Sequence, residues 1–248
     1  MANKKRADEL IFAKGFAESR EKAKRLIMAG QVYVCQGSGK IPVDKPGRFL
    51  SSDSCLELKR AERFVSRGGY KLLTALEHFN IEVRNRVCLD VGASTGGFTD
   101  CLLQHGAARV FALDAGYGQL HWKLRNDRRV VNLEKINIRT APLNILTGPV
   151  DMATVDCSFI SLKLVLPQVV KFLRTGGEIL ALVKPQFEVG RGMTDKGVVK
   201  SEDAALGAVQ KVIDMATHEV GLKHSGTIPS AIKGPKGNQE YIIYLCAP

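Results

Sequence analysis

The apolar and polar residues at the start of the chain follow helical spacing and then begin to alternate. Residues 4–15 predict a first helix, and a second is expected from the N-cap candidate Ser19 to the C-cap candidate Gly30. The alternating residues Val32–Val34 predict a short strand. The stretch 40–54 is rich in Gly, Pro and Ser, which is typical of loops and turns.

Further along, short apolar runs alternate with helical segments. The run 87–91 is suited to a strand buried on both faces. Further strands are expected at 110–113, 130–133, 152–155, 179–183, 223–228 and 241–246. Helices are expected at 98–105, 161–173 and 202–220. This alternation predicts a parallel sheet with helices on both faces. We therefore expect an α/β domain over residues 65–248, preceded by a small α+β domain with its linker over residues 1–64.

The charge balance points to a polyanionic partner. The chain has 248 residues, with 36 Lys and Arg against 25 Asp and Glu, a formal net charge of +11. Residues 1–65 hold 14 basic and 8 acidic side chains, so the first quarter carries +6 of this excess. Nucleic acid and an acidic membrane surface both fit such an excess.

Other classes of protein are disfavoured by what the sequence lacks. The first residues are polar and charged, without the apolar core of an export signal, and no apolar run is long enough to span a bilayer. The six cysteines are scattered and show no zinc-ligand spacing. We expect reduced thiols, no metal, no integral membrane association and a cytoplasmic location.

A glycine-rich turn after the first strand of the large domain is the main chemical signal. Its pattern, G-x-x-x-G-G, is neither the dinucleotide fingerprint nor a phosphate-binding loop. Asp114 ends the next strand and suits the two hydroxyls of an adenosine ribose, whereas Asp90 suits a ligand ammonium. S-adenosylmethionine combines both features, while a nicotinamide cofactor and a turn without ligand remain alternatives. The candidate cofactor contacts are Asp90, Gly92, Ala93, Ser94, Gly96, Gly97, Phe98 and Asp114.

Four further polar residues are placed where an α/β sheet gathers its functional side chains. Asp156 and Lys184 end predicted strands, Lys71 precedes the first strand of the large domain, and Glu240 precedes the last. Because ligands bind at the carboxyl ends of parallel strands, Asp156 and Lys184 are the stronger candidates. The alternative for each residue is a surface ion pair.

The segments around these four residues, in order and spacing, resemble the FtsJ-like ribose 2′-O-methyltransferases. The segment 5–64 resembles the RNA-binding domain named after ribosomal protein S4, and the whole chain is similar to the TlyA family, also called hemolysin A. The resemblance implies a class I (Rossmann-like) methyltransferase fold with a catalytic tetrad of Lys71, Asp156, Lys184 and Glu240. It also implies S-adenosylmethionine as cofactor, cytidine 2′-hydroxyls of 16S and 23S ribosomal RNA as substrate and ribosomal subunits as partners. We expect the protein to be a monomer.

Basic side chains supply candidate RNA contacts, although a solvated charged face is the alternative for each of them. These candidates are Arg6, Arg20, Lys24, Arg25, Arg67 and Arg191. The stretches 190–200 and 234–239 combine glycines with basic residues, and we expect them to be mobile loops over the site.

The tetrad suits methyl transfer to a weakly nucleophilic hydroxyl, because alignment for in-line displacement supplies much of the acceleration. We expect Lys184 to orient and deprotonate the hydroxyl. A second ammonium at Lys71 favours the neutral lysine that this role needs, whereas the carboxylates of Asp156 and Glu240 hold the lysines and oppose it. The sequence leaves open which effect prevails.

Two readings from other classes remain. A non-catalytic ribosome-assembly factor would keep the fold without the chemistry. The intact glycine turn and the presence of all four tetrad residues argue against it. A membrane-lytic protein, as the hemolysin name suggests, needs an amphipathic or spanning segment, and the sequence contains none of adequate length.

Overall fold

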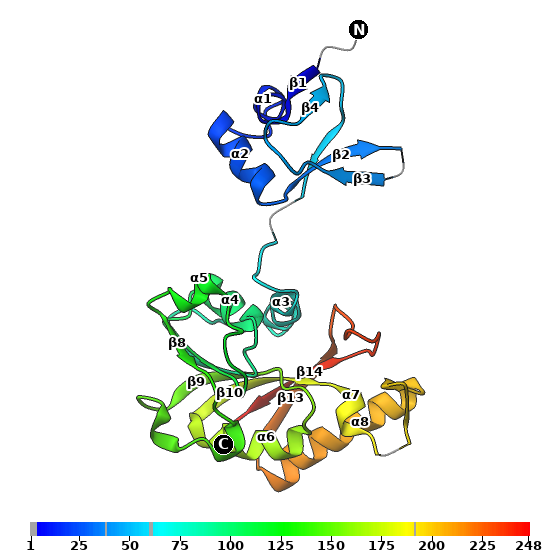
Figure 1. The fold of residues 1–248 in the computed structure, drawn as a ribbon. Coiled ribbons are helices and arrows are strands. Elements are labelled where there is room, and N and C mark those ends of the chain that lie inside the picture. Colours follow the sequence, from blue (N-terminus) through cyan, green and yellow to red (C-terminus); the bar gives the residue numbers. More distant parts are fainter. Residues whose placement is uncertain (1–3, 38, 60–61, 191) are drawn as a thin grey trace. The chain divides into compact units, whose positions relative to one another are not determined.

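The computed structural model describes residues 4–37, 39–59, 62–190 and 192–248 (Figure 1). These residues form two compact units that divide between Arg63 and Phe64. Each unit has its own hydrophobic core.

The N-terminal unit packs two helices against short antiparallel strands. Its elements are β1 (Lys4–Arg6), α1 (Ala7–Ala13), α2 (Arg20–Met28), β2 (Val32–Gln36), β3 (Gly39–Pro42), β4 (Phe49–Ser51) and β5 (Leu56–Leu58). Strand β2 lies between β3 and β5, and β1 pairs with β4. The side chains of Ile11 and Ile27 bring the two helices into one buried cluster with Val32.

Two expectations for this unit are corrected. Residues 4–6 form a strand instead of a helical turn, because they pair with Phe49–Ser51 in a register that local spacing does not reveal. The stretch 40–54, expected to be loop, contributes to β3 and contains β4. The expected N-cap is confirmed, since Ser19 Oγ accepts a hydrogen bond from the Lys22 N–H at 3.1 Å.

The described residues of the second unit form a mixed sheet with the strand order β13-β14-β10-β9-β6-β7-β8. The strands are β6 (Val87–Val91), β7 (Arg109–Leu113), β8 (Val130–Leu133), β9 (Val150–Val155), β10 (Leu173–Val183), β13 (Lys223–Pro229) and β14 (Tyr241–Cys246). The run from β10 to β8 is parallel, and β14 is antiparallel to both of its neighbours. The expected α/β class is confirmed, with an antiparallel hairpin added at one edge.

Helices cover both faces of this sheet (Figure 1). On one face lie α3 (Gly68–His78), α4 (Gly97–Gln104) and α5 (Trp122–Arg125); on the other lie α6 (Leu162–Val169), α7 (Pro185–Glu188) and α8 (Glu202–Asp214). Shorter elements are the 3₁₀ turns η1 (Ile138–Thr140), η2 (Leu143–Ile145) and η3 (Val170–Phe172), the π-helical turn η4 (Met215–Glu219) and the hairpin β11 (Thr194–Asp195) and β12 (Val198–Val199). No helix among the described residues is long and apolar enough to cross a bilayer.

Two of the expected helices change their hydrogen-bonding pattern before they end. The helix expected at 161–173 is α-helical only to Val169 and continues as η3, and the one expected at 202–220 becomes π-helical after Asp214. The topology matters more for function. Strand β6 is central, with β7 on one side and β9 on the other, so the chain reverses its winding direction beside β6. In open α/β sheets, ligands bind at the strand ends next to such a switch point.

Candidate functional site

Two adjoining cavities lie at the carboxyl ends of the central strands. The first has a volume of about 530 Å³ and the second about 770 Å³. Five residues line both cavities, namely Gly92, Ser94, Asp156, Ser158 and Phe159. A ligand with two unlike ends therefore finds connected space over the glycine-rich turn and the end of β9.

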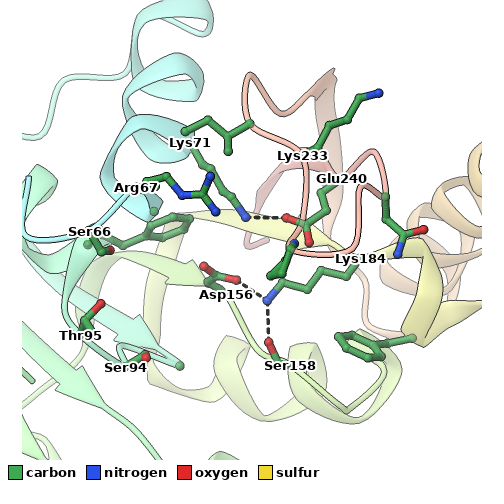
Figure 2. Close-up of a pocket in the computed structure, with 18 of the residues that line it drawn as sticks. Ser66, Arg67, Lys71, Ser94, Thr95, Asp156, Ser158, Lys184, Lys233 and Glu240 are labelled. Carbon is green, nitrogen blue, oxygen red and sulfur yellow. Dashed lines mark hydrogen bonds and ion pairs between the residues drawn. The ribbon is translucent and has the colours of Figure 1, made fainter. Parts of the chain in front are cut away.

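The first cavity brings the four tetrad candidates together as two ion pairs (Figure 2). Lys71 Nζ of α3 lies 2.5 Å from Glu240 Oε2, just before β14. Lys184 Nζ, which follows β10, lies 2.6 Å from Asp156 Oδ1, which follows β9. Both lysines are 9% exposed and Glu240 is 1% exposed, so these pairs are largely removed from water.

Ser158 is a member of the site that sequence reasoning missed. Its Oγ accepts a hydrogen bond from Lys184 Nζ at 2.8 Å (Figure 2). The contact fixes the ammonium from a second direction, beside the Asp156 contact. Its position could have indicated this role, because Ser158 stands two residues beyond Asp156 in the loop at the carboxyl end of β9, where ligands bind.

Glu240 is held by a turn that is itself tied to the β11–β12 hairpin. The Gly234 N–H bonds to the Asn238 carbonyl at 2.9 Å, and a Cβ at Gly234 would lie 2.6 Å from Glu240 Oε1. The buried Asn238 amide donates to the Gly197 carbonyl at 2.8 Å and accepts from the Val199 N–H at 2.9 Å. Residues of both expected loops thus line the first cavity, joined to each other by hydrogen bonds.

The glycines of the turn meet protein atoms at close range. Gly92 has a φ of +84°, and a Cβ there would lie 2.7 Å from the Asp156 carbonyl oxygen. A Cβ at Gly96 would lie 2.2 Å from Leu124 Cδ1, and one at Gly97 would lie 2.3 Å from Ser66 Oγ. Gly92, Ala93, Ser94, Gly97 and Phe98 line the first cavity, whereas Gly96 packs against α5.

Asp114 lies on the wall of the second cavity, where an adenosine ribose was expected. Its Oδ2 accepts from the Ser94 N–H at 2.8 Å and its Oδ1 from the Gly116 N–H at 2.6 Å. These bonds fix the carboxylate and leave acceptor capacity for ligand hydroxyls. The same wall contains Asn137 and Arg139, which the sequence did not single out.

Asp90 does not reach either cavity, so its expected role as partner of a ligand ammonium is corrected. The side chain is 0% exposed and accepts hydrogen bonds from Thr99 Oγ1 at 2.7 Å and Thr154 Oγ1 at 3.0 Å. It therefore supports α4 and β9 from within the core. Burial raises the pKa of Asp90 to about 6, and the nearby charge of Asp156 adds to this.

The raised pKa of Asp90 makes a prediction about stability. Because its folded-state pKa of about 6 lies above the ordinary 3.8, the stabilising contribution is complete below pH ~4 and is lost as pH rises through about 6. Asp90→Asn removes this titration. From pH 5 to pH 7 the unfolding free energy of the variant, relative to that of the native protein, should therefore rise by about 1 kcal/mol.

Urea unfolding followed by circular dichroism at both pH values measures this difference. The exposed Asp53→Asn is the control and should show a constant difference between the two pH values. A constant difference for Asp90→Asn as well would contradict a raised pKa at Asp90.

An aromatic pair, the exposed Phe159 and the half-buried Phe187, lines the first cavity. Phe159 is 91% exposed, has a φ of +63° and lies with its ring centroid 5.2 Å from that of Phe187. A positive φ is unusual for a bulky residue, and such strain clusters at ligand sites. The sequence carried no signal for this pair beyond the residue type.

The expected RNA contacts differ in their surroundings. In the N-terminal unit Arg6 and Arg20 both bond to the buried carboxylate of Asp8, at 3.1 Å and 3.3 Å, and remain about 40% and 47% exposed. Burial acts to raise the pKa of Asp8, but the bonds from the two arginines outweigh it and the pKa lies below its usual range. The remaining candidates divide as follows: Lys24 pairs with Glu21, Arg25 is exposed, Arg67 lines the first cavity, and Arg191 lies outside the described residues.

Family models agree with the division into two units. The FtsJ-like methyltransferase model matches residues 64–246, and the S4 domain model matches residues 5–37. The first match covers the sheet and all four tetrad positions.

Relatives match along nearly the whole chain. The chain is 43% identical to the Mycobacterium tuberculosis protein named 16S/23S rRNA (cytidine-2′-O)-methyltransferase TlyA, over 99% of this chain and 91% of that protein. It is 40% identical to Hemolysin A of Brachyspira hyodysenteriae, over 97% and 99% of the two chains. A solved structure, "Putative hemolysin from Streptococcus thermophilus", is 42% identical with a TM-score of 0.74, covering 100% of this chain and 90% of that one.

Proposed function

The chain belongs to the FtsJ-like methyltransferase family, and from this membership we propose that it transfers a methyl group from S-adenosylmethionine to a ribose 2′-hydroxyl of cytidine in 16S or 23S ribosomal RNA. The observation that carries the proposal is the pair of buried lysine–carboxylate contacts beside two adjoining cavities. Such a site has room for both a cofactor and a nucleotide. It presents ammonium groups to the oxygen that must react.

The residues present fit S-adenosylmethionine. The fixed carboxylate of Asp114 suits the hydroxyls of its ribose, and the glycine-rich turn offers backbone to the part of the ligand between the cavities. The buried Oε1 atoms of Gln186 and Glu240 accept no hydrogen bond within the described part of the chain, and both residues line the first cavity. They supply acceptors for a ligand ammonium in place of Asp90. When bound, this cofactor supplies an electrophilic methyl group on a positively charged sulfur.

Lys184 is the residue that we assign to the target hydroxyl. The contacts with Asp156 and Ser158 fix its nitrogen and leave one further hydrogen-bonding position for the substrate oxygen. Held in this way, Nζ orients the hydroxyl for in-line attack and, in its neutral form, takes up the proton. Lys71, fixed by Glu240, adds positive charge to the wall where the oxygen becomes anionic.

RNA selection falls to surfaces outside the tetrad. The S4-type unit carries the arginines around Asp8 and the exposed Arg25, which suit phosphate contacts. At the cavity rim, Arg67 and the aromatic pair Phe159 and Phe187 suit the backbone and base of an inserted nucleotide. We further propose that the protein acts as a monomer in the cytoplasm, where ribosomal RNA is found.

Methyl transfer to ribosomal subunits tests this proposal. With radiolabelled S-adenosylmethionine and subunits that lack 2′-O-methylcytidine, we expect label in the RNA and a new 2′-O-methylcytidine when nucleosides are separated by chromatography. Reverse transcription at low nucleotide concentration then locates the site. Label in protein, in lipid or on a base instead of a ribose would overturn the assignment.

A further inference from the structure

Trp122 is the single tryptophan of the chain, and its side chain is not used by the core. It opens the short helix α5 and is 71% exposed. An exposed tryptophan offers a partner a large apolar ring face together with a polar N–H. Neither the tetrad nor the two cavities account for it, since Trp122 lines neither cavity.

The segment around the indole is basic. Residues 121–129 read HWKLRNDRR, with four Lys or Arg against one Asp. Lys123, Arg125 and Arg128 are exposed. Lys123 Nζ lies 3.3 Å from Asp100, and Arg125 pairs with Glu134, so these two cations are positioned while still open to solvent. Cations beside an exposed aromatic ring are the combination that single-stranded nucleic acids bind, through phosphate contacts and base stacking.

A second aromatic ring in the preceding loop has the same character. Tyr117 is 70% exposed, and Lys135 Nζ lies 4.4 Å from the centroid of its ring. The Gly118 N–H bonds to Glu134 Oε1 at 3.0 Å, and Glu134 also pairs with Arg125 of α5. The loop after Asp114 and the helix α5 are thus joined into one aromatic and basic surface.

This surface is fixed to the rim of the first cavity. The His121 N–H donates to the Thr95 carbonyl at 3.2 Å, and Thr95 lines that cavity. The Leu124 side chain packs so closely on the glycine-rich turn that a Cβ at Gly96 would overlap it. His121 also orders the start of α5, because its Nδ1 accepts from the Lys123 N–H at 3.2 Å.

We propose that Trp122 is a stacking platform for an unpaired base of the RNA substrate, next to the nucleotide that enters the first cavity. The inference rests on the proposed function, because it takes RNA as the substrate. A lipid surface is the other class of partner for an exposed tryptophan among cations. Helix α5 has four residues, with Lys123 and Arg125 at its second and fourth positions and the polar Asn126 directly after it, so it offers no continuous apolar face to a bilayer.

The single tryptophan makes the test direct, because the native protein reports on this one position. We expect a single-stranded oligocytidine RNA of about 12 nucleotides to quench the tryptophan fluorescence and to reduce its accessibility to acrylamide. Polyphosphate of equal charge should do neither. Equal quenching by polyphosphate, no change with RNA, or a blue shift with phosphatidylglycerol vesicles but not with RNA would each overturn the proposal.

Kinetics with ribosomal subunits give a second, independent readout. Trp122→Ala should raise the KM for the subunit about tenfold with kcat within about twofold, since stacking on an aromatic ring is worth about that factor per base. Trp122→Phe should restore most of the affinity. Leu206→Ala, which removes a 46% exposed side chain from α8 on the other face of the sheet, is the matched control.

An unchanged KM in Trp122→Ala, or a fall in kcat at constant KM, would count against a platform. If the native enzyme methylated no ribosomal RNA, the proposed function would fail, while the oligonucleotide titration would still decide whether Trp122 stacks on RNA.

Discussion

Lys184→Met should lower the rate of methyl transfer by about a thousandfold or more and leave S-adenosylmethionine affinity within about twofold of the native value. Methionine keeps much of the side-chain length but has no nitrogen to orient the 2′-hydroxyl or take its proton. The loss should appear in kcat, because the nitrogen that Asp156 and Ser158 hold is needed for the reaction step.

Single-turnover transfer of labelled methyl groups measures the rate, and calorimetry measures cofactor binding. Lys233→Met is the matched control, because Lys233 lines the same cavity but is exposed, and Figure 2 shows its side chain directed away from the two ion pairs. It should retain nearly full activity. A Lys184→Met enzyme that kept a tenth of the native rate would refute the assignment of Lys184.

Gly92→Ala should destabilise the protein by about 2–4 kcal/mol and strongly weaken cofactor binding. Two costs add together at this position. The backbone has a φ of +84°, which an L side chain adopts at a cost of about 1–2 kcal/mol, and the new Cβ would lie 2.7 Å from the Asp156 carbonyl oxygen. The oxygen cannot easily move away, because the Asp156 N–H is bonded to Val91 at 2.9 Å. Any shift therefore moves the carboxylate that holds Lys184.

Gly118→Ala separates the two costs. Gly118 has a similar φ of +74°, but a Cβ there meets no atom within 4 Å. The Gly118→Ala variant should lose only about 1–2 kcal/mol of unfolding free energy, which is the cost of the backbone strain alone. Denaturant unfolding measures the stabilities, and calorimetry with S-adenosylmethionine measures affinity. If both variants lost equal stability and bound the cofactor equally well, the close approach of Gly92 to the end of β9 would not matter.

Local sequence patterns predicted most of the strands and helices of the large domain. Apolar runs such as 87–91 are recognised as buried strands from their own composition, and β6 matches this run. The strand-end positions of Asp156 and Lys184 followed from the same pattern, because parallel strands bring their carboxyl ends to one edge. Strands that form by pairing with residues far away in the sequence were not predicted, as the pairing of β1 with β4 shows.

The roles of individual polar residues were less predictable. Asp90 and Asp114 both lie at the carboxyl ends of neighbouring strands, Asp90 as the penultimate residue of β6 and Asp114 directly after β7. Asp90 is nevertheless fully buried against two threonines, whereas Asp114 lines a cavity. Which of them meets a ligand depends on which neighbours surround each side chain. The requirement for glycine at position 96 was equally hidden from the sequence. A side chain there would overlap Leu124 and Leu120, which belong to a separate segment of the chain.

By itself, the sequence determined the class of fold and the order of most strands and helices along the chain, because hydrophobic period is a local property, and the family resemblance pointed to the four residues that we propose for methyl transfer. Only the tertiary structure decided how those four pair, with Lys71 on Glu240 and Lys184 on Asp156, and that Ser158 supports Lys184 while Asp90 does not reach the cavity. Lys71 and Glu240 stand 169 positions apart. No local spacing encodes such a contact; it exists because α3 and the start of β14 are packed against the same end of one sheet.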